Sequence, residues 1–168
     1  MKKIFILLTI FIFPLLAVDL KEKFGIGFGW NMPAPLWGCW TAPHWVCGKI
    51  GVSSKFAIEP YAILDYLSQE KYLKWGIGGI LDYVFRSRER SNLYLKSGLK
   101  FESFLLERKW QYSKTGFIIG LGIEIWFLKN LSLDFSAYTE CFYQRNYENK
   151  SSNFSASFGY PLALIFYY

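Results

Sequence analysis

The sequence predicts an all-β chain whose strands close into an eight-stranded antiparallel up-and-down barrel. Three observations support this fold. Apolar residues alternate with small or polar ones through most of the chain after residue 18, charged residues avoid the apolar parity, and short turns alternate with longer connections. A period of two places successive side chains on opposite faces of a strand, whereas a helix requires a period of 3.6.

The composition excludes two broad classes of protein. The 168 residues, enough for one domain, are 52% hydrophobic, 21% aromatic and 19% charged. An intrinsically disordered chain has few aromatic residues and many charges, so disorder is excluded. The net charge is only +6, and two of the positive residues lie in the first three positions, so we expect no nucleic-acid partner.

Residues 1–17 have the pattern of a secretory signal peptide. Lys2 and Lys3 precede an apolar run that begins at Ile4, and Ala17 offers a small residue for cleavage. The run is shorter than the roughly 20 residues that a membrane-spanning helix requires. We therefore expect 1–17 to be removed on export and 18–168 to form the barrel domain.

The clearest strands are 116–128 and 131–143. In the first, Phe117 to Phe127 supply an apolar row at odd positions, while Gly120, Gly122 and Glu124 occupy even positions. The second repeats this alternation, and only Lys129-Asn130 separates the two. This spacing predicts a tight antiparallel hairpin.

The same criterion yields eight strands, which are 23–31, 44–52, 56–66, 72–85, 92–103, 116–128, 131–143 and 153–168. Short turns are expected at 53–55, 86–91 and 129–130. The connections on the other side are 32–43, 67–71, 104–115 and 144–152. Alternating short and long connections are typical of a transmembrane barrel with unequal rims. Pro161 lacks a backbone donor and predicts a bulge or kink in the last strand.

The charged residues of these strands share the face that carries the glycines. They are Lys23, Lys49, Glu59, Asp65, Lys74, Asp82, Lys96, Lys100, Glu102, Glu124, Asp134 and Glu140. Glycine and charges of both signs suit the crowded lumen of an eight-stranded barrel. We expect an interior charge network of Glu59, Lys74, Asp82, Lys96, Lys100, Glu102, Glu124, Asp134 and Glu140.

The apolar face, by contrast, is expected to meet lipid. Strands of this length match a tilted crossing of the hydrocarbon layer, and aromatic residues gather near strand ends, as at a membrane interface. Backbone groups in lipid must all be paired, which requires a closed ring. The last strand carries Phe166 and Tyr168 on its outward apolar row at the end of the chain.

These features resemble those of the bacterial outer-membrane β-barrel superfamily, in particular the small eight-stranded barrels of the outer-membrane protein A type. The matching segments are 120–126 (GLGIEIW), 130–133 (NLSL) and the terminal Phe166-Tyr167-Tyr168. The resemblance covers 19–168 and implies an outer-membrane location with both termini periplasmic. It also implies that Phe166 and Tyr168 act as the signal read by the barrel-assembly machinery. We expect no peptidoglycan-binding domain to follow residue 168, unlike in the larger members of that family.

Few residues suggest chemistry. His44 could serve as a catalytic base in a lipid-modifying enzyme, but the residues after it, Trp45 and Val46, do not give a His-x-Ser arrangement. An exported protein can form disulfides, and Cys39 and Cys47 could pair, which leaves Cys141 over. The first loop combines three tryptophans with three prolines, which suits either a partner surface or the membrane interface.

The expected function is therefore that of an outer-membrane barrel with a structural or surface-interaction role. Its filled lumen would allow weak small-solute transport at most. We expect outer-membrane lipid as a partner, and no enzymatic activity, cofactor or metal site. Two alternatives remain open: an outer-membrane lipid-modifying enzyme that uses His44, and a secreted soluble lipocalin-like carrier.

Overall fold

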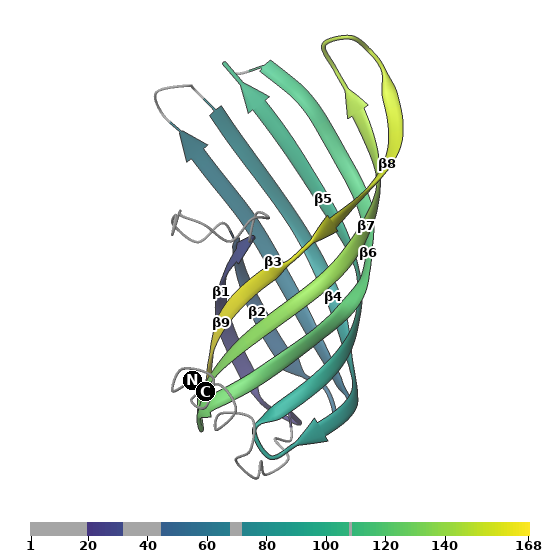
Figure 1. The fold of residues 1–168 in the computed structure, drawn as a ribbon. Helices are drawn as coiled ribbons and strands as arrows, with labels where there is room; N and C mark the ends of the chain where they lie inside the picture. Colours follow the sequence, from purple (N-terminus) through teal and green to yellow (C-terminus); the bar gives the residue numbers. More distant parts are fainter. Residues whose placement is uncertain (1–19, 32–44, 68–71, 108) are drawn as a thin grey trace, which may run out of the picture.

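The structure, a computed structural model, describes residues 20–31, 45–67, 72–107 and 109–168. Nine antiparallel strands form one sheet (Figure 1). They are β1 (Phe24–Asn31), β2 (Trp45–Gly51), β3 (Phe56–Leu67), β4 (Tyr72–Arg88), β5 (Ser91–Leu106), β6 (Lys109–Leu128), β7 (Leu131–Asn146), β8 (Ser152–Gly159) and β9 (Pro161–Tyr167). No helix in the described part of the chain is long and apolar enough to cross a membrane.

The sheet closes into a barrel because β9 pairs with both β7 and β1. The predicted all-β, eight-stranded antiparallel barrel is thus confirmed. The ninth strand arises because the last predicted strand, 153–168, is divided at Tyr160 into β8 and β9. Both parts pair with β7 in one register, since Tyr138 lies opposite Gly159 and Phe135 opposite Leu162.

Pro161 therefore interrupts the last strand without inserting a residue. The same number of residues separates the paired positions on both strands, so the predicted bulge is absent there. The break has a simple cause, because proline has no N–H to donate to a neighbouring strand.

One row of paired residues can be followed round the barrel. It passes through Phe154, Tyr143, Thr115, Phe101, Ile77, Ala62, Val46, Phe28 and Leu164. The row returns to the last strand ten residues further along the chain. With about 3.3 Å per residue and about 4.8 Å between strands, this stagger tilts the strands by about 40°.

Strand lengths differ from the predicted ones on both sides of the barrel. At the turn end, β4 continues to Arg88 and β5 begins at Ser91, so most of the expected turn 86–91 is strand. The expected loop at 104–115 is wrong, because β5 extends to Leu106 and β6 begins at Lys109. Strand β7 likewise extends into the expected loop 144–152. The predicted strands end where the regular alternation ends. Backbone pairing continues beyond that point, through polar residues in β7 and past a register shift between Phe104 and Leu105 in β5. Glu107, with a positive φ of 50°, helps the chain reverse in so short a connection.

The barrel has a complete part and an incomplete part, seen in Figure 1. In the complete part, which we call the lower barrel, β1, β2 and β9 close the ring. Beyond it, β3 to β8 extend further and form what we call the upper wall. Among the described residues, Leu64–Leu67 pairs there only with β4, and β8 pairs only with β7.

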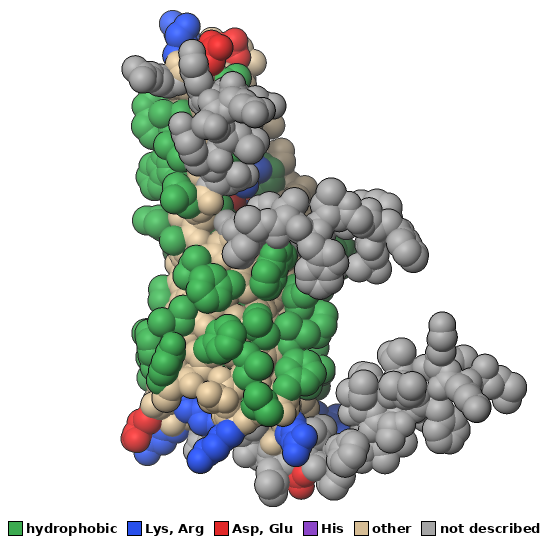
Figure 2. Space-filling model, turned by 90° about the vertical axis from the view of Figure 1, so that its left-hand side faces the viewer, with side chains coloured by type: hydrophobic (Ala, Val, Ile, Leu, Met, Phe, Trp, Pro, Cys, Tyr) green, Lys and Arg blue, Asp and Glu red, His purple; other side chains and the backbone are tan. Residues whose placement is uncertain are grey.

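The two faces of the barrel differ sharply in character. Large apolar side chains cover the outside of the wall, with Lys and Arg gathered at its lower end (Figure 2). Leu99, Leu121 and Phe158 are 66%, 58% and 76% exposed, whereas Lys49, Asp82 and Glu124 inside are 0% exposed. Inward glycines accommodate large neighbours, as where Gly29 faces the ring of Trp45.

Candidate functional site: the charged lumen

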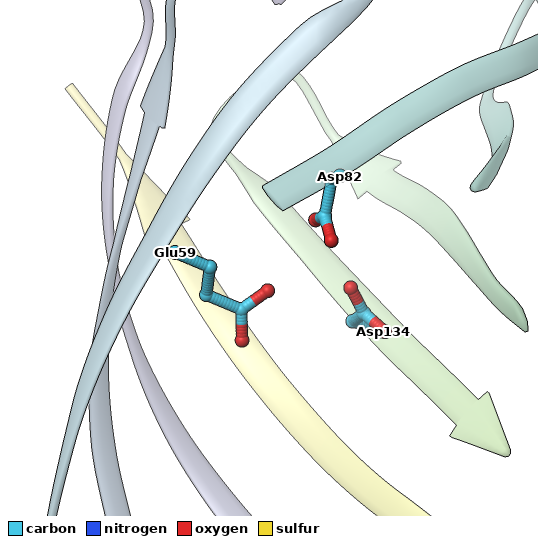
Figure 3. A group of neighbouring side chains, drawn as sticks. All are labelled: Glu59, Asp82 and Asp134. Atoms are coloured by element: carbon cyan, nitrogen blue, oxygen red, sulfur yellow. The ribbon is translucent and has the colours of Figure 1, made fainter. Parts of the chain in front are cut away.

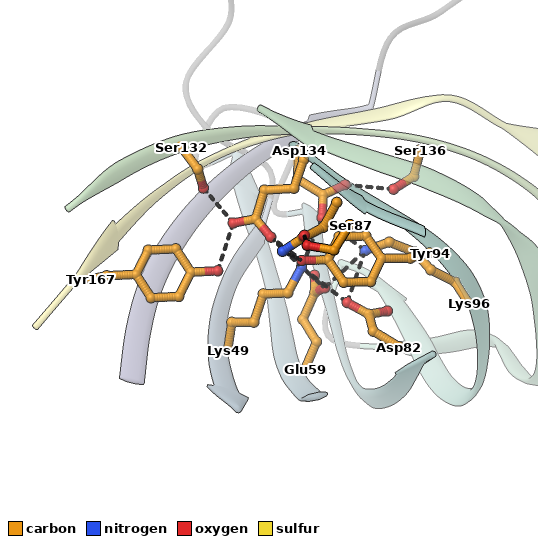
Figure 4. Close-up of polar contacts among 12 residues, drawn as sticks. Lys49, Glu59, Asp82, Ser87, Tyr94, Lys96, Ser132, Asp134, Ser136 and Tyr167 are labelled. Carbon is orange, nitrogen blue, oxygen red and sulfur yellow. Dashed lines mark hydrogen bonds and ion pairs between the residues drawn. The ribbon is translucent and has the colours of Figure 1, made fainter. Parts of the chain in front are cut away.

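A dense set of ion pairs crosses the lumen of the lower barrel. Strands β2 and β5 each place one lysine at its centre, Lys49 and Lys96, because both residues have inward parity. Four buried carboxylates surround them, and hydroxyl groups complete the set (Figure 4). This lower network comprises Lys49, Glu59, Asp82, Tyr94, Lys96, Glu124, Ser132, Asp134, Ser136 and Tyr167.

Lys49 makes the most contacts in the lower network. Its Nζ lies 3.0 Å from Asp82 Oδ2, 3.2 Å from Glu124 Oε2 and 3.0 Å from Asp134 Oδ2. The ammonium group also lies 4.1 Å from the centre of the Tyr94 ring, a cation–π distance. Removing this residue would leave several buried carboxylates without their main partner.

Lys96 joins the same carboxylates from the other side. Its Nζ lies 3.0 Å from Glu59 Oε2, 3.0 Å from Asp134 Oδ2 and 3.4 Å from Asp82 Oδ2. Ser136 donates a further hydrogen bond of 2.7 Å to Asp134 Oδ1. Most strands of the ring are thus tied together through two ammonium groups.

Glu124 is held by neutral donors as well as by Lys49. Tyr167 and Ser132 donate to Oε1 over 2.6 and 2.5 Å, and Tyr94 donates to Oε2. Hydroxyl donors replace the hydrogen bonds that water would give to a carboxylate, which lowers the free-energy cost of burying it. Tyr167 lies on β9, so the last strand is fastened into this network.

Three carboxylates of the lower network approach one another closely enough to suggest a metal site. Oxygens of Glu59, Asp82 and Asp134 lie within 4.8 Å of one another, and Figure 3 shows the three groups converging. However, the ammonium groups of Lys49 and Lys96 lie 3.0 Å from oxygens of the same group. The arrangement therefore favours internal ion pairs over a bound cation.

A second, smaller set of ion pairs lies further along the lumen, which we call the upper cluster. Lys100 Nζ lies 2.6 Å from Glu140 Oε2 and 3.2 Å from Glu102 Oε1, and Lys74 lies 3.6 Å from Glu102. Lys74 is 26% exposed and so partly hydrated. The upper cluster holds fewer carboxylates and less buried lysines than the lower network.

A pocket separates the two sets of charges. It is partly open, and Tyr61 and Tyr138 are among its lining residues. Lys96 and Asp134 of the lower network line it, as do Lys100 and Glu102 of the upper cluster. A solute entering from the upper wall would therefore meet the lower network as a barrier.

The nine charged residues expected in the lumen are all placed there, in two sets. Glu59, Asp82, Lys96, Glu124 and Asp134 belong to the lower network, and Lys74, Lys100, Glu102 and Glu140 to the upper cluster. At the chain terminus, Phe166 and Tyr168 point outward and are 39% and 83% exposed.

Five members of the lower network are absent from the predicted set. Lys49 lies on the charged face but is not among the predicted residues, and the other four, Tyr94, Ser132, Ser136 and Tyr167, are uncharged. Their inward parity was the available signal. A hydroxyl on the charged face of a strand is a natural donor to a buried carboxylate.

Several predicted features fall outside the described residues. These are the signal peptide, the tryptophan-rich loop, His44 and Cys39, so the His44 and disulfide hypotheses stay predictions. Within the described part, Cys47 is a free thiol that is 2% exposed in the lumen.

A scan against models of protein families, a search of curated proteins and a search of solved structures each found no match.

Proposed function

We propose that this chain is a small bacterial outer-membrane β-barrel, of the outer-membrane protein A type, with a structural or surface-interaction role. The observation that carries the proposal is the side on which each kind of residue lies. Ionised groups fill the interior of the ring, while the exposed surface is dominated by large apolar side chains such as Leu99 and Leu121. A protein surrounded by water would expose an aggregation-prone apolar surface of this extent.

The same arrangement weighs against a soluble lipocalin-like carrier. Such a carrier would need an apolar cavity for its ligand and a polar outer surface. Here Lys49 and Glu124 occupy the interior instead. Lipid outside the ring also explains why closure is needed, because unpaired backbone groups are costly in hydrocarbon.

The filled lumen supports a structural role over transport. An eight-stranded ring leaves an interior just wide enough for side chains, and the lower network occupies it. We propose that small solutes cross weakly if at all. We further propose that Phe166 and Tyr168 present the terminal aromatic signal to the barrel-assembly machinery.

Cell-envelope fractionation combined with heat-modifiability tests the proposal. The full chain, produced with residues 1–17, should appear in the outer-membrane fraction and should migrate differently on a gel before and after boiling. Recovery in the soluble periplasmic fraction without detergent, with one mobility, would contradict it.

A pair of substitutions on β6 separates lipid from water as the surrounding medium. Leu121 is 58% exposed on the apolar face, and Gln111 lies on the same strand beyond the apolar row. In a membrane, Leu121→Lys should lower folding stability in vesicles by about 2–4 kcal/mol, while Gln111→Lys should change it by less than about 1 kcal/mol. If the outside faces water, both variants would fold equally well without lipid.

A further inference from the structure

The turn end of the barrel is basic. Five exposed cations lie there, namely Lys55, Arg86, Arg88, Arg90 and Lys129, and they outnumber the acidic Glu89, while Lys21 and Glu22 form an ion pair with each other. Figure 2 shows Lys and Arg side chains gathered directly below the apolar surface at this end. At the opposite end, the exposed charges of the described residues nearly balance, because Lys109, Arg145 and Lys150 are accompanied by Glu107 and Glu148.

A β-bulge at the end of β4 directs two of these arginines outward. Along β4 the even-numbered residues face the lumen as far as Val84, which lies opposite Tyr94. The register then shifts, so that Arg86 lies opposite Leu93 and Arg88 opposite Ser91. Leu93 belongs to the outward row of β5. If the alternation of β4 continued without this register shift, Arg86 and Arg88 would point into the lumen, and re-aiming a side chain is a known effect of bulges.

The bulge also fills the inward position with a smaller group. Ser87 takes the lumen side, where its Oγ donates a 2.6 Å hydrogen bond to Asn92 Oδ1. The adjacent Phe85, 53% exposed, lies on the outer face beside Arg86. The guanidinium groups therefore sit at the border of the apolar surface.

The arginines of the turn end have no anionic partner in the described part of the chain. The ion pairs of that part involve lysines, and Arg86, Arg88 and Arg90 take part in none of them. Guanidinium groups bind phosphate through paired hydrogen bonds. At the edge of a hydrocarbon layer, the nearest phosphates are those of lipid headgroups.

We propose that Arg86, Arg88 and Arg90 form a binding site for the phosphate groups of anionic phospholipids in the leaflet that meets the turn end. Lys55 and Lys129 extend the site round the rim. This inference rests on the proposed function, since it requires the barrel to lie in a bilayer. The bulge at Phe85–Arg86 is then the structural device that places the arginines against the headgroups.

The test compares folding equilibria, measured by urea titration, in vesicles of phosphatidylcholine alone and with about 30 mol% phosphatidylglycerol. A basic residue near an anionic surface contributes about 1 kcal/mol, or roughly fivefold. We expect the wild type to be favoured at least tenfold in the anionic vesicles. The variant R86Q/R88Q/R90Q should lose most of that preference, and the loop-end variant K109Q/R145Q/K150Q should retain it.

Two controls, high salt and inorganic phosphate, separate the possible causes of the preference. High salt should abolish the wild-type preference by screening, which gives a readout even where the triple variant folds poorly. Inorganic phosphate added to neutral vesicles should not reproduce the effect, and if it does, lipid is not the specific ligand. Equal wild-type stability in both vesicles, or an equal loss in the loop-end variant, would overturn the inference alone. Failure to fold in either vesicle would overturn the proposed membrane location.

Discussion

The lower barrel and the upper wall are built from the same strands but are held together differently. In the lower barrel every strand has two neighbours, and buried lysines each contact several carboxylates. In the upper wall β8 has one partner strand, and Lys74 makes a 3.6 Å ion pair while partly hydrated. The difference shows that cohesion among the described residues is concentrated at one level of the barrel.

This contrast predicts its largest effect at Lys49. Lys49→Met should lower the unfolding free energy by about 3–5 kcal/mol, because it leaves buried carboxylates uncompensated. The upper-wall counterpart, Lys74→Met, should cost less than about 1 kcal/mol, since its ion pair is partly exposed. Urea unfolding in lipid vesicles measures both. Equal losses would show that the two levels are held with similar strength.

A smaller effect is expected from adding a methyl group inside the ring. At Gly120 a Cβ would lie 2.6 Å from Tyr138 Cβ and 2.7 Å from Tyr138 Cα. Gly120→Ala should therefore cost about 1–3 kcal/mol by forcing the β7 backbone to shift. At Gly116, four residues nearer the open end, the nearest atom is Glu140 Oε1 at 3.1 Å, and Gly116→Ala should cost less. The same urea titration ranks the two variants. A larger loss for Gly116→Ala than for Gly120→Ala would contradict the tighter packing around Gly120.

A further comparison, of similar size, separates two tyrosine hydroxyls. Tyr167→Phe removes a buried 2.6 Å hydrogen bond to Glu124, which should cost about 1.5–3 kcal/mol because the acceptor is charged. Tyr147→Phe in the upper wall removes an exposed 3.1 Å contact with Ser113, and should cost less than about 0.5 kcal/mol. Thermal unfolding, followed by the loss of the unboiled gel band, compares them. A Tyr167 variant as stable as the wild type would show that β9 does not depend on this bond.

The sequence was sufficient for the architecture and for the two faces of the strands. Period-two alternation separated Ile119 from Glu124, and the structure has the first 48% exposed and the second fully buried. Strand ends on the loop side were not predictable in this way. Pairing continues through Leu106 and Lys109 past a register shift between Phe104 and Leu105, where the period-two alternation breaks, so that alternation carries no signal for it.

The charged site was predictable as a set but not as a geometry. Parity identifies which residues share the lumen, yet it does not reveal the level at which each one lies. That level depends on the stagger of the strands, which brings Lys49 of β2 to Asp134 of β7 across the ring. The bulge that turns Arg86 outward was likewise invisible, because a single extra residue leaves the local composition unchanged.

The position of β9 has a consequence for the order in which the ring can close. The final seven strand residues supply both the seam to β1 and the hydroxyl of Tyr167 that reaches Glu124. Until those residues are in place, β1 has no partner on one side and Glu124 lacks the donor from Tyr167. The ring therefore closes only when the last residues of the chain are available, and a chain truncated before Pro161 should remain an open, protease-sensitive sheet.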